Sequence, residues 1–274
     1  MLHFEIGERP IMKSVFLLVC IALVWLCGSV HGRTWLVAKD GTGEVTTIQA
    51  GIDLATAGDT VLVGGGTYRG PVWLDHKSGI CLRSETGRAN CVTLLPDLSG
   101  NHYNAGIWCW DVDGTTEIEG FTVLNAGWSG DGGGFNFYSS AASVRNCEVT
   151  YVMTFAGTGV FCEGKYGAAS PSITDCTFSH NVGYGLNGSI IYCEDSSPTI
   201  TGCTFYDNVG WWGVVYCVGE ASEPVITECT FMCNRSDTDA VGCADGATPW
   251  IERTIIAHNR GVERYTVPTP IASL

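Results

Sequence analysis

The stretch Pro171–Asn181, PSITDCTFSHN, occurs four times with small changes in the second half of the chain. PTITGCTFYDN begins at Pro198, PVITECTFMCN at Pro224, and a weaker copy, PWIERTIIAHN, at Pro249. The four prolines are separated by 27, 26 and 25 residues. A fixed period of this length is typical of a solenoid, in which each copy forms one unit that stacks on the next.

Each repeat has a second half that is also centred on a cysteine. The segments are GVFCEG near Cys162, SIIYCED near Cys193, GVVYCVG near Cys217 and AVGCAD near Cys243. Both halves are short runs of β-branched and aromatic residues bounded by Gly, Ser, Asn or Asp, which is the pattern of short strands. The repeat therefore predicts an all-β parallel β-helix of about seven to eight coils, in which each strand pairs with its counterpart in the next coil.

The cysteines are expected to stack inside this solenoid. Alternation along a strand turns Cys176 and Phe178 to one face and Thr177 to the other. Ile173 also faces inward if the chain bends near Thr174 and Asp175. In-register side chains point the same way, so a disulfide between coils would be strained, and the columns lack the histidines and short spacings of a zinc site. Buried thiols are therefore favoured over disulfides, which remain the alternative, in two columns: Cys147, Cys176, Cys203, Cys229, and Cys162, Cys193, Cys217, Cys243.

The asparagine that closes each repeat has a structural interpretation. Asn181, Asn208, Asn234 and Asn259 keep the same spacing as the prolines. Asparagine tolerates turn conformations, and stacked copies of it can form a ladder of side-chain hydrogen bonds. We predict such a ladder at one corner of the solenoid.

The amino-terminal part predicts export and a cap. Residues 1–32 have the pattern of a signal peptide whose true start lies near Met12. Its apolar run is too short to span a membrane and is followed by small residues at the expected cleavage site. Residues 33–70 are expected to form the cap and first strand. In TTIQAGIDLATAG, Ile48, Ile52 and Ala55 share one face of a short helix that ends at Gly58 and covers the open end of the core.

The rest of the chain is expected to consist of the coils and a tail. Residues 71–265 are expected to form the β-helix coils and residues 266–274 a tail, and the missing second cap is what a truncated chain would show. No membrane span is expected in the mature protein. The last coil would lack a cap, which predicts end-to-end association.

These motifs resemble a known group. IQAGIDLATAGDTVLVGGGTYRG, the repeated PxITxCTFxxN and IYCEDSSP are similar to secreted right-handed parallel β-helix proteins of the pectin lyase-like superfamily. The resemblance implies a right-handed solenoid. VAKDGTGEVTTIQAGID and GTYRG are also similar to the start of pectin methylesterases.

The sequence does not contain the catalytic motifs of the enzymes that it resembles. The chain contains no QDTL or DFIFG stretch of pectin methylesterases and no GHG or RIK stretch of polygalacturonases. Pectate lyases use calcium-binding acids and an arginine base, but Arg145, Arg235, Arg253 and Arg260 lie in no recognisable motif. Recognisable motifs therefore do not support catalysis.

The formal net charge of −14 limits the ligands. It excludes nucleic acid as a partner and disfavours unaided binding of a polyuronate, because like charges repel. A polyuronate would need a bridging cation, and calcium is the expected one.

Outward positions of the second strand form a column of aromatic residues. We predict carbohydrate-binding residues at Trp108, Trp110, Phe161, Tyr192 and Tyr216, with Asn136 in the same column. Flat aromatic faces suit sugar rings, whereas the alternative is that the rings support one another along the sheet.

Acidic residues accompany this column. Candidate catalytic residues are Asp111, Asp113 and Asp131, and candidate calcium ligands are Asp111, Asp113, Glu163 and Glu194. The alternative for an aspartate beside a glycine is a turn.

The sequence thus predicts a secreted extracellular or cell-surface module that contacts polysaccharide. One alternative is a polysaccharide-active enzyme, with a calcium-dependent lyase ahead of a glycoside hydrolase or an esterase. The other is a structural or adhesive spacer.

Overall fold

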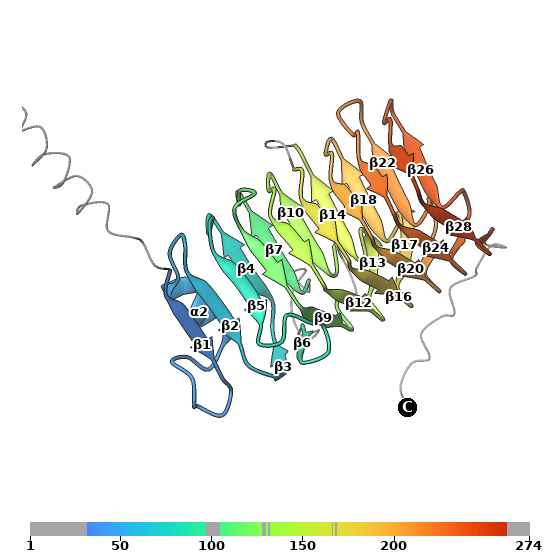
Figure 1. The fold of residues 1–274 in the computed structure, drawn as a ribbon. Helices are drawn as coiled ribbons and strands as arrows, with labels where there is room; N and C mark the ends of the chain where they lie inside the picture. The colour runs from blue at the N-terminus through green and yellow to red at the C-terminus, as the bar shows by residue number, and fades with distance from the viewer. Residues whose placement is uncertain are drawn as a thin grey trace, which may run out of the picture. The chain divides into compact units, whose positions relative to one another are not determined.

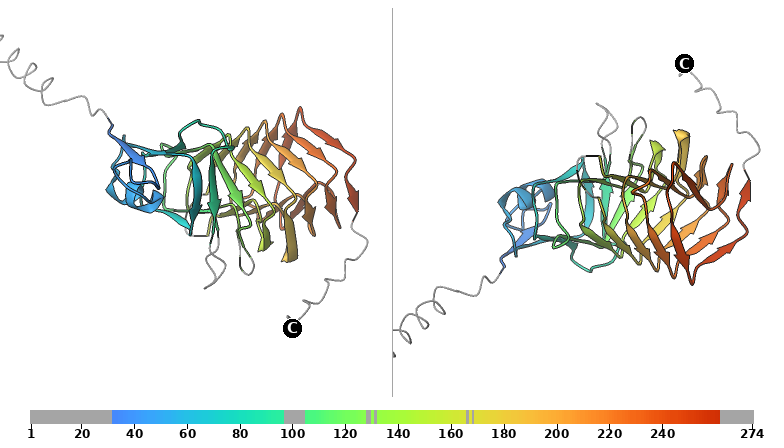
Figure 2. Two further views of the ribbon diagram at one scale, coloured as in Figure 1. Left: turned by 90° about the horizontal axis from the view of Figure 1, so that it is seen from below. Right: turned by 90° about the horizontal axis from the view of Figure 1, so that it is seen from above.

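The computed structural model describes residues 32–261, except residues 97–104, 128, 129, 131, 166 and 168. All of the described residues but Gly32 belong to one compact unit, Arg33–Leu274. Its strands wind into a right-handed parallel β-helix of about eight coils, as the repeat predicts. The coils follow one another in chain order along the stack, and two further views show the same succession (Figures 1 and 2).

From β2 to β26 the chain passes repeatedly through sheet A, then sheet B, then sheet C. Sheet A contains β1 (Thr34–Val37), β2 (Thr60–Val63), β5 (Cys81–Ser84), β8 (Glu117–Glu119), β11 (Ser143–Arg145), β15 (Ser172–Thr174), β19 (Thr199–Thr201), β23 (Val225–Thr227) and β27 (Trp250–Glu252). Sheet B contains β3 (Gly66–Arg69), β6 (Val92–Leu95), β9 (Phe121–Leu124), β12 (Glu148–Thr150), β16 (Thr177–Ser179), β20 (Thr204–Tyr206), β24 (Thr230–Met232) and β28 (Ile255–Ala257). Sheet C contains β4 (Val72–Asp75), β7 (Ile107–Trp110), β10 (Phe135–Tyr138), β14 (Val160–Glu163), β18 (Ile191–Glu194), β22 (Val215–Val218) and β26 (Val241–Ala244).

A fourth sheet, sheet D, lies between sheets B and C in the later coils. It contains β13 (Met153–Ala156), β17 (Val182–Asn187), β21 (Val209–Gly210), β25 (Arg235–Ser236) and β29 (Arg260–Gly261). Gly157 joins β13 to β14 with a φ of +54°, and a Cβ there would lie 2.6 Å from the Val160 carbonyl oxygen. Only glycine fits this turn, which directs the chain from sheet D into sheet C.

The core consists of columns of side chains from successive coils. Parallel in-register pairing aligns Ile173, Ile200 and Ile226 in sheet A, and Phe178, Phe205 and Phe231 in sheet B. The phenylalanine rings stack with centroids 4.9 and 4.5 Å apart, and all three are fully buried. Each buried phenylalanine stabilises the fold by about 1.5–3 kcal/mol, so the repeat builds its own core.

The bend that the repeat requires lies at Asp175. This residue has a φ of 51°, and it separates β15 from β16, so Ile173 and Phe178 both face inward. The turn after sheet B has one residue with a positive φ in each repeat. The residue before each asparagine has the positive φ, and it is His180, Asp207, Cys233 or His258.

The asparagines instead bond to one another through their side chains. Asn181 Nδ2 donates to Asn208 Oδ1 at 3.1 Å, Asn208 Nδ2 to Asn234 Oδ1 at 2.9 Å, and Asn234 Nδ2 to Asn259 Oδ1 at 3.0 Å. Asn181 and Asn208 are fully buried and Asn234 is almost so. These bonds satisfy polar groups that would otherwise be costly to bury.

The described cysteines are all free thiols. Cys176 Sγ and Cys229 Sγ each donate to a backbone carbonyl two residues earlier at 3.2 Å. Cys162, Cys193 and Cys217 pair in register and are fully buried. Cys243 continues this column but is exposed, because β26 is the edge strand of sheet C.

A short helix covers the amino-terminal end of the core. Helix α2 spans Ile48–Leu54, so it ends before the predicted Gly58, with Ala55 as its C-cap. The Thr47 side chain accepts a hydrogen bond from the Ala50 N–H and begins the helix. Ile48, Ile52 and Ala55 are buried, as predicted. Within the described part of the chain, no helix has the length and apolarity needed to cross a membrane.

Candidate functional site

The outer face of sheet C holds the aromatic column. Register aligns Trp73, Trp108, Asn136, Phe161, Tyr192 and Tyr216 on successive coils. The last position of each strand aligns Asp75, Trp110, Tyr138, Glu163 and Glu194. Their inward neighbours, such as Leu74, Cys109 and Phe137, are fully buried. Sheet C, whose strands are labelled in Figure 1, therefore has one face toward the core, and its register and burial give the other face mixed aromatic and acidic side chains.

The aromatic rings on this face form one continuous row, which we call the aromatic row. Its neighbouring centroids lie 5.0 Å apart for Trp73–Trp108, 5.6 Å for Trp108–Tyr138, 5.6 Å for Tyr138–Phe161, 5.4 Å for Phe161–Tyr192, 6.1 Å for Tyr192–Tyr216 and 5.7 Å for Tyr216–Trp212. Trp110 joins the row through Tyr138, at 5.3 Å. Several pairs are close to parallel, including Trp108–Tyr138 at 3°. Such contacts stabilise a sheet face by about 0.5–1.5 kcal/mol per pair beyond area burial.

Ring stacking reduces the solvent exposure of several residues in the aromatic row. Trp108, Phe161 and Tyr192 point outward as expected, but they are only 7%, 4% and 3% exposed. Neighbouring rings cover their faces. In the folded protein these three residues therefore do not offer sugar rings the open aromatic faces that the sequence predicts. Ala156 at the end of β13 packs against Phe161 and Tyr192 in a small second core.

Accessible aromatic surface lies at other positions of the row. Trp110 is 42% exposed and Trp212 is 39% exposed, while Trp73, Tyr138 and Tyr216 are half-buried. Of these, only Trp110 and Tyr216 were predicted from the sequence as carbohydrate-binding residues. Alternation along the strands would have identified Tyr138 and Trp73. Trp212 lies in the turn after β21, and no strand period predicts where its side chain points.

The two aspartates of WDVDG have separate partners. Asp111 Oδ2 lies 2.8 Å from His76 Nδ1, and Asp75 Oδ1 lies 3.6 Å from His76 Nε2. Asp113 accepts hydrogen bonds from the Thr115 N–H and hydroxyl. These bonds lower the pKa of Asp113, with the side-chain bond as the larger cause. Asp113 is therefore an ionised turn residue rather than half of a carboxylate pair with Asp111.

The other acidic candidates lie in neighbouring coils. Glu163 and Glu194 are register partners at the ends of β14 and β18. The Tyr192 hydroxyl donates to Glu194 Oε2 at 3.2 Å. No three His, Cys, Asp or Glu side chains among the described residues are gathered as metal ligands would be. The donor set proposed for calcium thus does not come together there, and Asp131 lies outside the described residues.

A second exposed aromatic surface occurs beside sheet D. Tyr151, Met153 and Phe155 are 58%, 42% and 44% exposed, and they alternate with buried residues along β13 and its approach. Phe155 contacts Tyr184 of the next coil with ring centroids 4.5 Å apart. Sequence reasoning did not identify these residues, because their strand belongs to the unanticipated fourth sheet.

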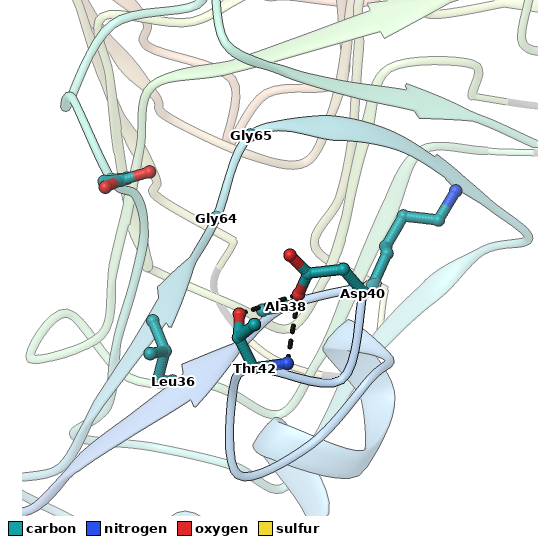
Figure 3. A pocket seen from close by; sticks show the side chains of 8 residues that line it. Leu36, Ala38, Asp40, Thr42, Gly64 and Gly65 are labelled. Carbon is teal, nitrogen blue, oxygen red and sulfur yellow. Dashed lines mark hydrogen bonds between the residues drawn. The ribbon is translucent and has the colours of Figure 1, made fainter.

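A small polar hollow lies near the amino-terminal cap. It has a volume of about 330 Å³ and is lined by Leu36, Ala38, Lys39, Asp40, Thr42, Gly64, Gly65 and Glu85 (Figure 3). Asp40 Oδ1 accepts hydrogen bonds from the Thr42 hydroxyl at 2.7 Å and from the Thr42 N–H at 3.0 Å. The dashed bonds in Figure 3 show that Asp40 closes its own turn.

Comparison with solved structures reveals similar folds. Two crystal structures of pectin methylesterase from Aspergillus niger, in deglycosylated and penultimately deglycosylated forms, are each 18% identical, with 88% of both chains covered and TM-scores of 0.49 and 0.50. Pectin methylesterase from carrot is 14% identical, with 88% of this chain and 86% of that chain covered and a TM-score of 0.49. No curated protein matches this chain.

The chain also matches a family model, over a longer stretch of the solenoid than any of the sequence motifs above. The model described as "Right handed beta helix region" matches residues 105–266, which include the repeats and six of the seven strands of sheet C. This is more than half of the 274 residues. The chain therefore belongs to the right-handed β-helix family.

Proposed function

We propose that this protein is an extracellular module that binds a polysaccharide along the outer face of sheet C. The observation that carries the proposal is the aromatic row, with Trp110 and Trp212 exposed on it. Exposed aromatic rings contact the apolar faces of sugars, and carboxylates beside them accept hydrogen bonds from sugar hydroxyls. The ligand would follow the stack of coils, whose strands are about 4.8 Å apart.

The buried rings contribute to the proposed site by fixing the exposed ones. Tyr138 contacts both Trp108 and Trp110, so the position of Trp110 depends on rings that are almost fully covered. A rigid platform loses little conformational entropy when a ligand binds. The covered residues Trp108, Phe161 and Tyr192 are thus positioning residues in this proposal.

Binding is proposed rather than catalysis. Asp111 and Asp113 bond to different partners, and the catalytic motifs of the resembling enzymes do not occur in the sequence. The signal-peptide pattern of residues 1–32, which lies outside the described residues apart from Gly32, supports the extracellular location.

A glycan array followed by affinity electrophoresis tests the proposal. We expect binding to at least one polysaccharide, weakened roughly 2- to 10-fold by Trp110→Ala and by Trp212→Ala, in line with about 0.5–1.5 kcal/mol per aromatic contact. Trp250→Ala is the matched control, because Trp250 is 63% exposed but lies in β27 of sheet A.

Two results would overturn this function. If the protein binds no glycan on the array, the result favours a structural spacer. If neither tryptophan variant weakens binding, the binding site lies elsewhere. Calcium-dependent appearance of unsaturated product from a uronate polymer would instead show that the protein is a lyase.

A further inference from the structure

The carboxyl edge of sheet C carries much of the charge of the protein. The strands of this sheet end at residues 75, 110, 138, 163, 194, 218 and 244, and the segments after them share one edge of the solenoid. From the last strand residue to the start of sheet A in the next coil, these segments contain nine carboxylates and two lysines: Asp75, Asp111, Asp113, Glu163, Glu194, Asp195, Glu220, Glu223, Asp245, Lys77 and Lys165. Their net charge of −7 is half of the −14 of the chain.

One of the two lysines is directed away from this edge. Lys77 Nζ donates to the carbonyl oxygens of Asp53 and Ala55, both at 3.0 Å, at the end of the cap helix. His76 lies between Asp75 and Asp111, whose side chains are 65% and 64% exposed. Asp195 is also exposed and has a φ of 45°, so it projects from a tight turn. The edge therefore presents carboxylates to solvent beside the exposed Trp110.

Other parts of the solenoid surface are closer to neutral. On sheet A, Arg145 Nη2 lies 3.2 Å from both Glu117 and Glu119, and Arg83 Nε lies 3.7 Å from Glu119. At the turn after sheet B, the non-glycine positions with positive φ hold one acid, Asp207, and otherwise Asn125, Tyr151, His180, Cys233 and His258. The excess of negative charge is thus concentrated next to the aromatic row.

From this arrangement we infer that the polysaccharide carries free amino groups, that is, a cationic polymer of amino sugars. The inference rests on the proposed function. Ammonium groups would form charge-assisted hydrogen bonds with the edge carboxylates, and their sugar rings would contact Trp110 and the aromatic row. A polymer that carries a charge on each sugar matches an edge on which six of the seven segments hold at least one carboxylate.

The same charge disfavours the acidic polysaccharides that the family resemblance suggests. A polyuronate would face net repulsion from the edge, and the described carboxylates are not gathered into a cation site that could bridge the two. A neutral polymer would bind the aromatic row without using the edge. The attraction of a polycation is instead largest at low ionic strength, because salt screens exposed charges.

Three matched oligosaccharides test this inference on the mature protein: a glucosamine oligomer, its fully N-acetylated counterpart and an oligogalacturonate of equal length. At low salt we expect the glucosamine oligomer to bind at least about tenfold more tightly than the acetylated one, and this ratio to shrink as salt is raised. Asp111→Asn with Asp195→Asn should reduce the ratio, and asparagine tolerates the positive φ of both positions. Asp207→Asn is the control, because Asp207 is an exposed acid at the turn after sheet B.

The outcomes separate the inference from the proposed function. Equal binding of the two glucosamine forms, or tighter binding of the uronate, would overturn the inference while leaving the polysaccharide function in place. No binding of any glycan would overturn both. Polylysine that binds as tightly as the glucosamine oligomer would reveal a general acidic surface for basic peptides and would also overturn the inference.

Discussion

Asn208 makes four side-chain hydrogen bonds at a position with no solvent exposure. Its Nδ2 donates to Asn234 Oδ1 at 2.9 Å and to the Phe178 carbonyl at 2.8 Å, and its Oδ1 accepts from the N–H and Nδ2 of Asn181. We predict that Asn208→Ala lowers the free energy of unfolding by about 3 kcal/mol, because it leaves buried polar partners unsatisfied. Urea unfolding measures this loss.

Asn187→Ala is the control for this prediction. Asn187 is exposed at the end of β17, so its truncation should change stability by less than about 0.5 kcal/mol. A loss at Asn208 as small as that at Asn187 would show that the stacked amides do not stabilise the coils.

The thiols should differ strongly in reactivity. Burial raises the pKa of the Cys109 thiol, which keeps it protonated and unreactive. Burial is the largest single effect on the Cys91 thiol and raises its pKa, but hydrogen bonds with Thr86, including its hydroxyl at 3.1 Å, and with Ser84 together lower the pKa below its ordinary value. We therefore expect alkylation of the native protein at Cys91, Cys233 and Cys243, and of the buried thiols only after unfolding.

Mass spectrometry of native and urea-unfolded samples, alkylated without reductant, measures these reactivities. Buried cysteines that stay unmodified after unfolding would indicate disulfides and contradict the stacked free thiols. At the residue scale, strand alternation predicted which cysteines face inward. It could not predict the exposure of Cys243, which depends on the position of β26 as the outermost of the described strands of sheet C.

Among the elements, the amino-terminal cap depends on one carboxylate. Asp59 accepts hydrogen bonds from the N–H of Thr56 at 2.9 Å and of Arg33 at 2.7 Å, and from the Trp35 indole at 3.3 Å. These bonds, with that of Thr56 as the largest cause, lower its pKa from 3.8 to about 2. Asp59 thereby joins the end of helix α2 to strand β1.

This lowered pKa makes the stability of the cap depend on pH. Because the pKa of Asp59 is lower in the folded protein, its contribution is fully present above 3.8 and is lost as the pH falls toward about 2. We predict that Asp59→Asn lowers the Tm at pH 6 and reduces the fall in Tm between pH 4 and 2. Asp237→Asn, at an exposed acid in a later coil, is the control.

Calorimetry across this pH range checks the prediction. A wild-type Tm that falls between pH 4 and 2 by the same amount as that of Asp59→Asn would contradict it. At this scale the sequence predicted the cap helix and its buried residues. The role of Asp59 could not be predicted, because Arg33 is 26 residues away in the chain.

In the molecule as a whole, the two ends of the described solenoid differ. Helix α2 covers the first coil, whereas Trp250, Ile251, Ile255 and Ile256 of the last described coil are 63%, 42%, 60% and 51% exposed. Strands β26, β27, β28 and β29 are the edges of their sheets. Exposed apolar edge strands favour pairing with other chains.

We predict that this chain associates in a concentration-dependent manner through that coil. Trp250→Glu with Ile255→Glu should abolish the association, because it places like charges at the edge. Leu54→Glu, at a 49% exposed site on the cap helix, should leave it unchanged. Sedimentation velocity over a range of concentrations measures the effect, and a protein that stays monomeric throughout would contradict the prediction.

The nearly fixed period of PSITDCTFSHN predicts the coil, and its alternation, together with a bend near Thr174 and Asp175, assigns Ile173 and Phe178 to the core. The sequence also identified the outward aromatic column of sheet C and the acids beside it. Which of these residues are accessible depends on the stacking of the coils: Trp108 and Tyr192 are covered by rings from neighbouring coils, whereas Trp110 is exposed, as is Trp212, which the sequence did not identify. The reason is that strand period sets the direction of a side chain, while its exposure depends on side chains about 25 residues away that only the stacked coils bring into contact.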